Sequence, residues 1–356
     1  MSLNIKTDQI VRALLFAALA AAAIAAVGAC ADTDPLEPAD EIVATLTVSA
    51  VDAWSFVAFV GQVAEPVNPG DRATSEAWDL GFFATSVMLN GGAAGPAGVV
   101  GHCLCQNASA TNGAIMAMTP DSKLVDFEAV TAADIPTETS SWTSDALAAA
   151  IDGWYSYDPV THVVSAAPEN VWKVRTASGE SFAKFHVTGL EGATQSHAGR
   201  VTFEFAVQPV GGGAFEPPET VTVDVSSGAV RFDIETGAVA AGSADWDLQF
   251  DGYDIRVNGG VSGTGSSGAS LSGESFGAIV DAGDLTATHY RGDAFGGVFD
   301  EHPWYRYNLD GNHQIWPTFD VYLVRRGDSV YKVQITSYYG ATGDARQITF
   351  RYAKLQ

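Results

Sequence analysis

A set of short motifs occurs twice along the chain, in the same order and at nearly constant spacing. Trp78–Phe82 is matched by Trp246–Phe250, and the Asn-Gly-Gly turn at Asn90 is matched at Asn258, so both pairs lie 168 residues apart. Self-similarity at a fixed spacing indicates a duplicated structural unit. Four further pairs lie 147–150 residues apart: Trp154–Tyr157 with Trp304–Tyr307, Val171–Arg175 with Val321–Arg325, Phe182–Phe185 with Val330–Val333, and Val201–Phe205 with Ile348–Tyr352. We therefore expect two copies of one domain.

Within each copy the residue pattern is typical of β-strands. The apolar runs are short, rich in Val, Phe, Tyr, Trp and Thr, alternate with polar residues, and are separated by Gly, Asn and Asp. The pattern predicts an all-β fold of two tandem antiparallel domains, over residues 45–210 and 219–356. Residues 211–218, with their Gly and Pro, are the expected linker. One exception is a short helix expected over residues 145–151, capped by Thr143 or Ser144.

The N-terminus has the pattern of a bacterial lipoprotein signal. Lys6 and Arg12 precede an uncharged run over residues 13–27, which is long enough for a signal peptide and short for a spanning helix. The run ends in small residues placed directly before Cys30, and this arrangement resembles a lipobox. We therefore expect a signal peptide over residues 1–29, a lipid on Cys30, and a tether over residues 30–44 that holds the protein on a membrane.

The charge of the chain limits its partners. The formal net charge is −24, and it becomes −25 when residues 1–29 are removed. Such a surface repels phosphate backbones, so nucleic acid is not expected as a partner. The sequence has no Gly-x-Ser-x-Gly, His-Glu-x-x-His, P-loop or dinucleotide-binding fingerprint. The repeated Trp-Asp pairs fit strands with the Trp inward and the Asp outward, so we do not expect an enzyme.

The duplicated motifs together resemble the HmuY family of surface lipoproteins. The resemblance covers about residues 45–210 and 219–356, and it is strongest over Val330–Tyr339 of the second copy. It implies an all-β fold, an outer-membrane lipoprotein facing the periplasm or the exterior, and haem held between two axial histidines on loops. The family's second axial position, about five residues after the tryptophan of the aromatic strand, corresponds to Pro159 and Leu309, neither of which can ligate iron.

Other histidines are the remaining candidates for haem ligands. Imidazole suits ferric haem, and the neighbouring aromatic residues could shield it. Histidines in Gly/Asp loops are more often simply solvated. The candidates are His162 and His313, in equivalent loops of the two copies, and His289 and His302, which lie in the preceding connection of the second copy.

The first copy also contains two cysteines that the second copy lacks. Cys103 and Cys105 lie two residues apart beside His102. They can form a local disulfide if the chain bends there, as Gly98, Gly101 and Gly113 would permit, or they can bind a soft metal together with His102. We expect the disulfide.

Two functions remain open from the sequence. The first is binding of haem or a related porphyrin by a membrane-anchored lipoprotein. The alternative is a non-haem surface scaffold or assembly protein that binds an outer-membrane protein partner or a glycan, and the residues Pro159 and Leu309 favour it.

Overall fold

The computed structural model describes residues 43–240, 242 and 246–356, and these residues form an all-β protein. The predicted signal peptide, Cys30 and all but the last two residues of the tether lie outside the described residues. Every pair of named strands is antiparallel, which confirms the predicted fold class. None of the described helices is long and apolar enough to cross a membrane. The α-helices are α1 (Asn112–Ala117), α2 (Leu124–Glu128) and α3 (Val298–Glu301), and single 3-10 turns occur at Ala132–Asp134, Thr139–Ser141 and Ala287–His289.

The first group of sheets, here called lobe A, is built from residues 44–145 and 297–356. It contains a five-stranded sheet, a four-stranded sheet and a two-stranded hairpin. In sheet order, the five strands are β1 (Ala44–Ser49), β24 (Ala345–Lys354), β23 (Ser329–Tyr339), β22 (Tyr322–Arg326) and β6 (Val100–Cys103). The four strands are β3 (Val63–Val67), β2 (Ser55–Val60), β4 (Leu80–Phe83) and β5 (Ser86–Leu89), and the hairpin pairs β20 (Tyr305–Tyr307) with β21 (Ile315–Pro317).

The second group, lobe B, is built from residues 149–293 and has the same three sheets. Its five strands are β13 (Glu219–Asp224), β12 (Arg200–Gln208), β11 (Phe182–Glu191), β10 (Val171–Arg175) and β18 (Gly268–Ser272). Its four strands are β15 (Ala238–Val239), β14 (Val230–Asp233), β16 (Leu248–Asp251) and β17 (Asp254–Val257), and its hairpin pairs β8 (Tyr155–Tyr157) with β9 (Val164–Ala166).

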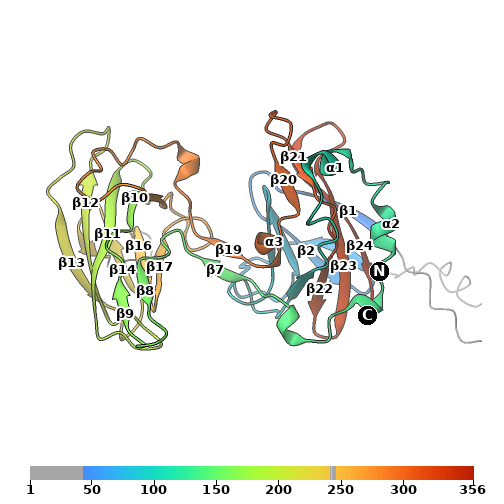
Figure 1. Cartoon of the computed structure of the whole chain (residues 1–356), viewed down its shortest axis with the longest axis horizontal. Helices are drawn as coiled ribbons and strands as arrows, with labels where there is room; N and C mark the ends of the chain where they lie inside the picture. The colour runs from blue at the N-terminus through green and yellow to red at the C-terminus, as the bar shows by residue number, and fades with distance from the viewer. Residues whose placement is uncertain (1–42, 241, 243–245) are drawn as a thin grey trace, which may run out of the picture. The chain divides into compact units, whose positions relative to one another are not determined.

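Each five-stranded sheet therefore combines strands from both sequence copies. In Figure 1 the N-terminal strand β1 lies beside the C-terminal strand β24, and their register pairs Leu46 with Phe350. In lobe B, strand β18 of the second copy pairs with β10 of the first. The chain passes between the lobes in a two-stranded ribbon of β7 (Ala146–Ala148) and β19 (Ala294–Gly296).

Two sequence-based expectations differ from the observed strands. Residues 211–218 are not a joint between domains, because the strands on either side of them pair with each other, Arg200 opposite Asp224. The predicted ranges 45–210 and 219–356 consequently do not coincide with the lobes. Residues 146–148 form strand β7 rather than part of a helix, because their backbone pairs with β19. Sheet pairing here overrides the helix propensity of alanine and leucine.

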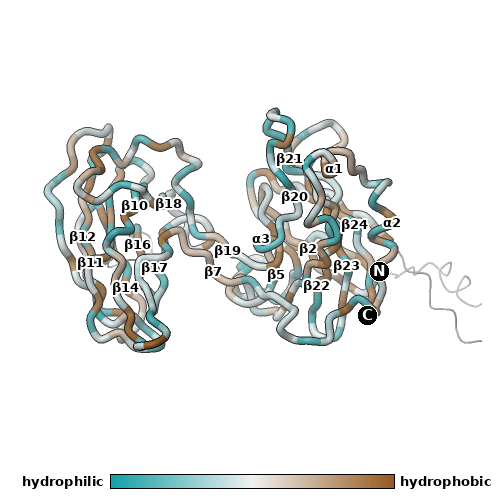
Figure 2. Tube along the Cα trace, viewed as in Figure 1, coloured by the Kyte–Doolittle hydropathy of each residue, from teal (hydrophilic) through white to brown (hydrophobic). Residues whose placement is uncertain are grey.

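Each lobe has its own apolar core between its two larger sheets. Figure 2 shows hydrophobic segments along the central strands of both. Fully buried aromatic side chains fill the cores, as the alternating pattern predicts, because one face of each strand is turned inward. Lobe A buries Trp304, Tyr322, Phe82 and Phe350, and lobe B buries Trp154, Trp172, Phe185, Phe203 and Phe250.

The repeated Trp-Asp motif has a structural role in both lobes, and the predicted outward direction of the aspartate is wrong. Asp79 and Asp247 are 1% and 2% exposed. The Asp79 carboxylate accepts a hydrogen bond from the Phe59 amide at 2.6 Å, and Asp247 accepts one from the Ile234 amide at 2.8 Å. These carboxylates satisfy backbone donors that would otherwise be buried without partners, which is why an acidic residue occupies an interior position.

Candidate ligand-binding site

The two-stranded hairpins place a tyrosine and a histidine together in each lobe. The tryptophan before each hairpin, Trp154 or Trp304, is buried and anchors its base in the core. In each connecting loop the histidine adopts a left-handed backbone, with φ of 57° at His162 and 58° at His313. This conformation reverses the chain so that the histidine returns toward the first strand of its hairpin.

In both hairpins the tyrosine hydroxyl is hydrogen-bonded to the histidine ring. The Tyr157 hydroxyl lies 2.6 Å from Nδ1 of His162, and the Tyr307 hydroxyl lies 2.7 Å from Nδ1 of His313. When Nδ1 carries the ring proton and the tyrosine oxygen accepts it, Nε2 is the unprotonated nitrogen, with its lone pair directed away from the tyrosine. Both histidines are exposed, so Nε2 is accessible.

The hairpin of lobe B borders a cavity of about 780 Å³. Tyrosine faces, the His162 ring and short aliphatic side chains make up its walls. This volume lies in the range of about 300–1,000 Å³ that is usual for small-molecule sites. No carboxylate, lysine or arginine is among its lining residues, although the chain as a whole is strongly acidic. The lining residues are Tyr155, Tyr157, His162, Val163, Val164, Leu190, Gly192, Ala193, Thr194, Gln195 and Tyr253.

The wall opposite the hairpin was not predicted from the sequence. It comes from the end of β11, the loop that follows it, and the turn between β16 and β17 that carries Tyr253. The Tyr253 hydroxyl donates a hydrogen bond to the Thr194 carbonyl at 2.6 Å and so ties these two segments together. Burial, and then the neighbouring Tyr155, raise the pKa of Tyr253, which keeps its phenol neutral. Thr194 and Tyr253 lie about 60 positions apart in the sequence, and no local pattern indicates that they meet.

The equivalent hairpin of lobe A is held by a segment that lobe B lacks. The Arg306 guanidinium donates hydrogen bonds to Asn112 Oδ1 at 3.0 Å and to the Ala108 carbonyl at 3.3 Å. Helix α1 begins at Asn112 and packs against β21. The lobe A hairpin is therefore braced by α1, whereas the lobe B hairpin borders an open cavity.

His289 and His302 do not join the hairpin histidines. His289 precedes Tyr290, whose ring packs on Phe182 at the first residue of β11, with 5.3 Å between ring centroids. The cavity beside His162 lies at the other end of β11, and a ten-residue strand extends about 30 Å. His162 and His289 therefore cannot bind one iron atom. His302 follows α3 and lines a different cavity, of about 270 Å³, which His313 does not line.

The structure contains a disulfide between Cys103 and Cys105. The chain bends at Cys105 itself, where φ is 50°, and this brings the two Cα atoms to 5.1 Å. His102 points to the other face of β6, where Nδ1 lies 2.7 Å from the Ser141 carbonyl. Instead His302 is the histidine beside the sulfur atoms, since its ring and both sulfurs offer ligand atoms within 4.8 Å of one another.

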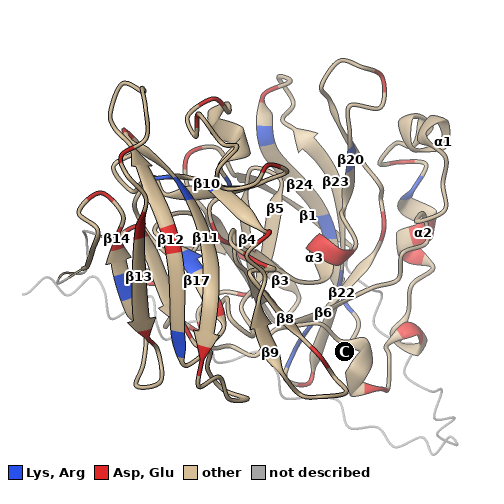
Figure 3. Cartoon of the chain, turned by 60° about the vertical axis from the view of Figure 1, so that its left-hand side comes forward, with Lys and Arg blue, Asp and Glu red and all other residues tan. Residues whose placement is uncertain are grey.

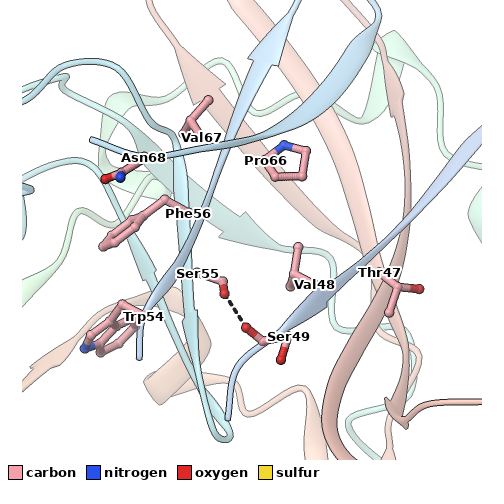
Figure 4. Close-up of a pocket in the computed structure, with 9 residues that line it drawn as sticks. All are labelled: Thr47, Val48, Ser49, Trp54, Ser55, Phe56, Pro66, Val67 and Asn68. Atoms are coloured by element: carbon pink, nitrogen blue, oxygen red, sulfur yellow. Dashed lines mark hydrogen bonds between the residues drawn. The ribbon is translucent and has the colours of Figure 1, made fainter. Parts of the chain in front are cut away.

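A further cavity of about 430 Å³ lies between β1 and the β2–β3 hairpin of lobe A. Figure 4 shows Trp54 and Phe56 on one side of it and Pro66 and Val67 on another, with Ser55 donating a hydrogen bond to the Ser49 carbonyl. Its lining has no histidine, cysteine or carboxylate. This cavity therefore has no imidazole, thiolate or carboxylate that could ligate iron, and the cavity beside His162 is the stronger candidate.

Acidic residues occur on strands, loops and helices throughout the described chain, including α2 and α3 (Figure 3). None of them is among the lining residues of the cavity of lobe B. A neutral cavity in an acidic protein can accept a ligand that carries carboxylates at its edge, provided that those carboxylates point to solvent.

A protein-family model matches the part of the chain that carries the first set of motifs. The family model described as HmuY protein matches residues 50–205 and confirms the resemblance inferred from the sequence. The match includes strands of both lobes, from β2 to β12. It does not extend to the second set of motifs, so the second copy remains a prediction. A search of curated proteins gave no match.

Among the solved structures that match parts of the chain are proteins of three bacteria. A protein of Bacteroides fragilis described as a lipoprotein is 16% identical over 43% of this chain and 88% of its own, with a TM-score of 0.17. A protein of Bacteroides vulgatus, described as an HmuY-like haem-binding protein, is 14% identical over 46% of this chain and 96% of its own, with a TM-score of 0.16. The apo form of an HmuY analogue of Tannerella forsythia is 19% identical over 38% of this chain and 83% of its own, also with a TM-score of 0.16.

Proposed function

We propose that this HmuY-family chain is a lipoprotein anchored to the bacterial outer membrane through Cys30, and that it binds haem or a related flat porphyrin in the cavity of lobe B. The family match and the lipobox before Cys30 support the surface location. The cavity beside His162 is the observation that supports a porphyrin as the ligand.

The walls of the cavity suit a flat aromatic ligand. Tyr155 and Tyr253 lie with their ring centroids 4.9 Å apart at an angle of 41°, so they form an aromatic wall with an apolar body and polar tips. Leu190 and Val164 supply aliphatic surface nearby. A porphyrin would lose water from its two faces against these side chains, while its charged edge would stay in solvent.

His162 is the residue that would ligate the iron. Its Nδ1 is occupied by the Tyr157 hydroxyl, and such a bond fixes the orientation and tautomer of a metal-binding imidazole. Haem iron is commonly held by one proximal histidine. Pro159, at the family's second axial position, offers no ligand, so the site differs from a two-histidine haem site.

Titration of the full chain carrying Cys30→Ser with ferric haem, followed in the Soret region, tests this proposal. We expect a saturable shift at one equivalent of haem at micromolar concentration. His162→Ala should remove the shift, whereas His313→Ala, the matched substitution in the other hairpin, should leave it intact. The absence of a saturable shift, or its loss in His313→Ala alone, would refute the assignment.

The alternative function is a non-haem scaffold for a protein partner or glycan. It is favoured by Pro159 and Leu309, which replace both histidines expected at the family's second axial position. Affinity capture from an outer-membrane fraction distinguishes the two functions. A stoichiometric partner, recovered with a chain that binds no haem, would support the scaffold.

A further inference from the structure

The sheet exchange between the two sequence copies brings a histidine of the C-terminal part to the two cysteines of the N-terminal part. Cys103 ends strand β6, which pairs with β22, so that Cys103 lies opposite Tyr322. His302 directly follows helix α3. The imidazole and the two sulfurs offer ligand atoms that all lie within 4.8 Å of one another. About 200 residues separate His302 from the cysteines, so the sequence alone gives no sign of this cluster.

Tyr322 fixes the two parts of the cluster relative to each other. Its backbone pairs with Cys103, and its hydroxyl donates a hydrogen bond to the His302 carbonyl at 2.6 Å. The Phe299 ring of α3 stacks on the Tyr322 ring, with 4.3 Å between centroids. The His302 amide is also bound, to the Val298 carbonyl at 3.0 Å. The backbones that carry Cys103 and His302 are thus held by contacts that do not depend on the disulfide.

We propose that reduction of the Cys103–Cys105 disulfide converts this cluster into a site for one soft divalent cation, with zinc as the reference ion. Two thiolates and one imidazole are a donor set that zinc prefers, with water in the fourth position. Zinc holds sulfur at about 2.3 Å and imidazole nitrogen at about 2.0–2.1 Å, so its ligand atoms lie roughly 3.5–3.8 Å apart. The present spacing, within 4.8 Å, needs only small side-chain movements to reach that range.

The surroundings of the cluster also suit a cation. The cavity beside it, of about 270 Å³, is lined by two carboxylates, Glu301 and Asp320, and by one cation, Arg306, in addition to Cys105 and His302. Asp320 is 5% exposed and accepts a hydrogen bond from the Asn107 amide at 2.7 Å. Two carboxylates near a bound cation lower its electrostatic energy and offer acceptors to its water ligand.

The redox step is a two-electron exchange with a dithiol. The dithiol reduces the sulfur–sulfur bond and becomes a disulfide itself, while its two protons pass to Cys103 and Cys105. Zinc then displaces both thiol protons into solvent and binds the thiolates together with the neutral imidazole of His302. While the disulfide is intact, the sulfurs are not available as thiolate ligands.

Lobe B provides an internal comparison. Strand β18 is the equivalent of β6, and Leu271 lies opposite Trp172 where Cys103 lies opposite Tyr322. The chain is therefore expected to bind one zinc ion in lobe A and none at the corresponding place in lobe B.

Equilibrium dialysis of the full chain carrying Cys30→Ser against zinc alone tests the proposal, with and without a phosphine reductant that does not chelate the metal. We expect one zinc per chain after reduction and none with the disulfide intact. His302→Ala should weaken binding by at least the roughly 10–100-fold that even a lost second-shell contact costs. His102→Ala, which changes the histidine next to Cys103 in the sequence, is the matched control and should bind like the parent.

Cobalt substitution separates sulfur ligation from adventitious binding. The reduced chain with cobalt should show thiolate-to-cobalt charge-transfer absorption, and Cys103→Ser should abolish it. Equal zinc binding by the oxidised chain, or by His302→Ala, would overturn the proposal. So would loss of binding in His102→Ala alone. Circular dichroism of the reduced chain is expected to match that of the oxidised chain, and unfolding on reduction would also overturn the proposal.

Discussion

Lobe A and lobe B have the same arrangement of sheets, and they differ in the segments that pack over those sheets. In both, a buried lysine at the centre of the long strand donates hydrogen bonds to the carbonyls of a covering segment. Lys332 binds the carbonyls of Phe127 and Val130, at the end of α2, whereas Lys184 binds those of Phe276 and Ile279. Both lobes thus have such a lysine, while the segments that it binds differ.

The hairpins differ in the same way. Both hold a tyrosine–histidine pair, but Arg306 and helix α1 brace the hairpin of lobe A, and the hairpin of lobe B borders a cavity. The residues common to the two lobes thus define a similar scaffold, and we expect the segments outside them to determine which ligand each lobe can bind. Four predictions test this comparison.

The largest effect concerns which part of the chain folds alone. Residues 149–293 are continuous and contain all three sheets and the whole apolar core of lobe B. This segment should therefore unfold cooperatively by itself, since its core needs no side chain from lobe A. Thermal unfolding followed by circular dichroism measures this.

A shorter segment, residues 149–210, is the control for that experiment. It lacks β13–β18 and therefore the core residues from Val223 to Ala269. We expect it to remain unfolded. If residues 149–293 showed no cooperative transition, lobe B could not be regarded as an independent folding unit.

The second prediction compares the two buried lysines. Lys332→Met keeps the length and apolar stem of the side chain but leaves two buried carbonyls without this donor, so it should destabilise lobe A by about 2–4 kcal/mol. Lys184→Met should cost less, because desolvation lowers the pKa of Lys184, so the cost of burying its charge offsets part of what its hydrogen bonds contribute. Urea unfolding of both variants gives the comparison. Equal losses would show that the covering segments contribute equally.

Sequence reasoning succeeds here for features that depend on local pattern. The alternating runs predict the strands, the motif tryptophans are buried, and the Asn-Gly-Gly turns close as expected. Gly92 shows why glycine is needed there, since its φ is 59° and a Cβ atom would lie 2.0 Å from the Asp145 carbonyl oxygen. The positive φ follows from the turn sequence itself, whereas the close contact with Asp145 comes from a distant part of the chain.

The sequence does not determine which copy supplies each strand. Strand β6 pairs with β22 and strand β18 pairs with β10, and the local pattern of neither strand indicates this exchange. Only the path of the chain through β7 decides which copy supplies the edge strand of each sheet. The alanines and the leucine of β7 favour a helix when they are considered alone. The proximity of His302 to the cysteines, and the far wall of the cavity, follow from that path and were therefore not predicted.

The third prediction concerns pH and the equivalent aspartates Asp145 and Asp293. Burial raises the pKa of Asp145 to about 7, and the nearby Asp300 adds to the shift. Burial also raises the pKa of Asp293, but hydrogen bonds from Ala150 and Ser262, together with the charge of Arg256, act in the opposite direction. A raised carboxyl pKa means that the folded state binds the proton more tightly. Stability from this group is therefore present at low pH and is lost as pH rises from about 4 through about 7.

Urea unfolding at pH 5 and pH 8 tests this difference. The parent chain should be less stable at pH 8, and Asp145→Asn should reduce the loss by about 1–3 kcal/mol, at about 1.4 kcal/mol per pKa unit. Asp293→Asn is the matched control and should reduce the loss less. A parent chain that is equally stable at both pH values would contradict the assignment of a raised pKa to Asp145.

The smallest effect separates the two tyrosine–histidine pairs, and it rests on the proposed haem site. Tyr157→Phe removes the hydroxyl that lies 2.6 Å from Nδ1 of His162 without changing the aromatic wall. Because this contact is exposed, stability should fall by only about 0.5 kcal/mol. Haem affinity should fall about tenfold, since a lost second-shell bond leaves the imidazole free to rotate. Tyr307→Phe removes the equivalent contact in lobe A and should leave haem affinity unchanged, because Arg306 and α1 brace that hairpin. Parallel haem titrations of the two variants decide the matter. Equal losses of affinity would place a ligand at both hairpins, and a loss in Tyr307→Phe alone would move the site to lobe A.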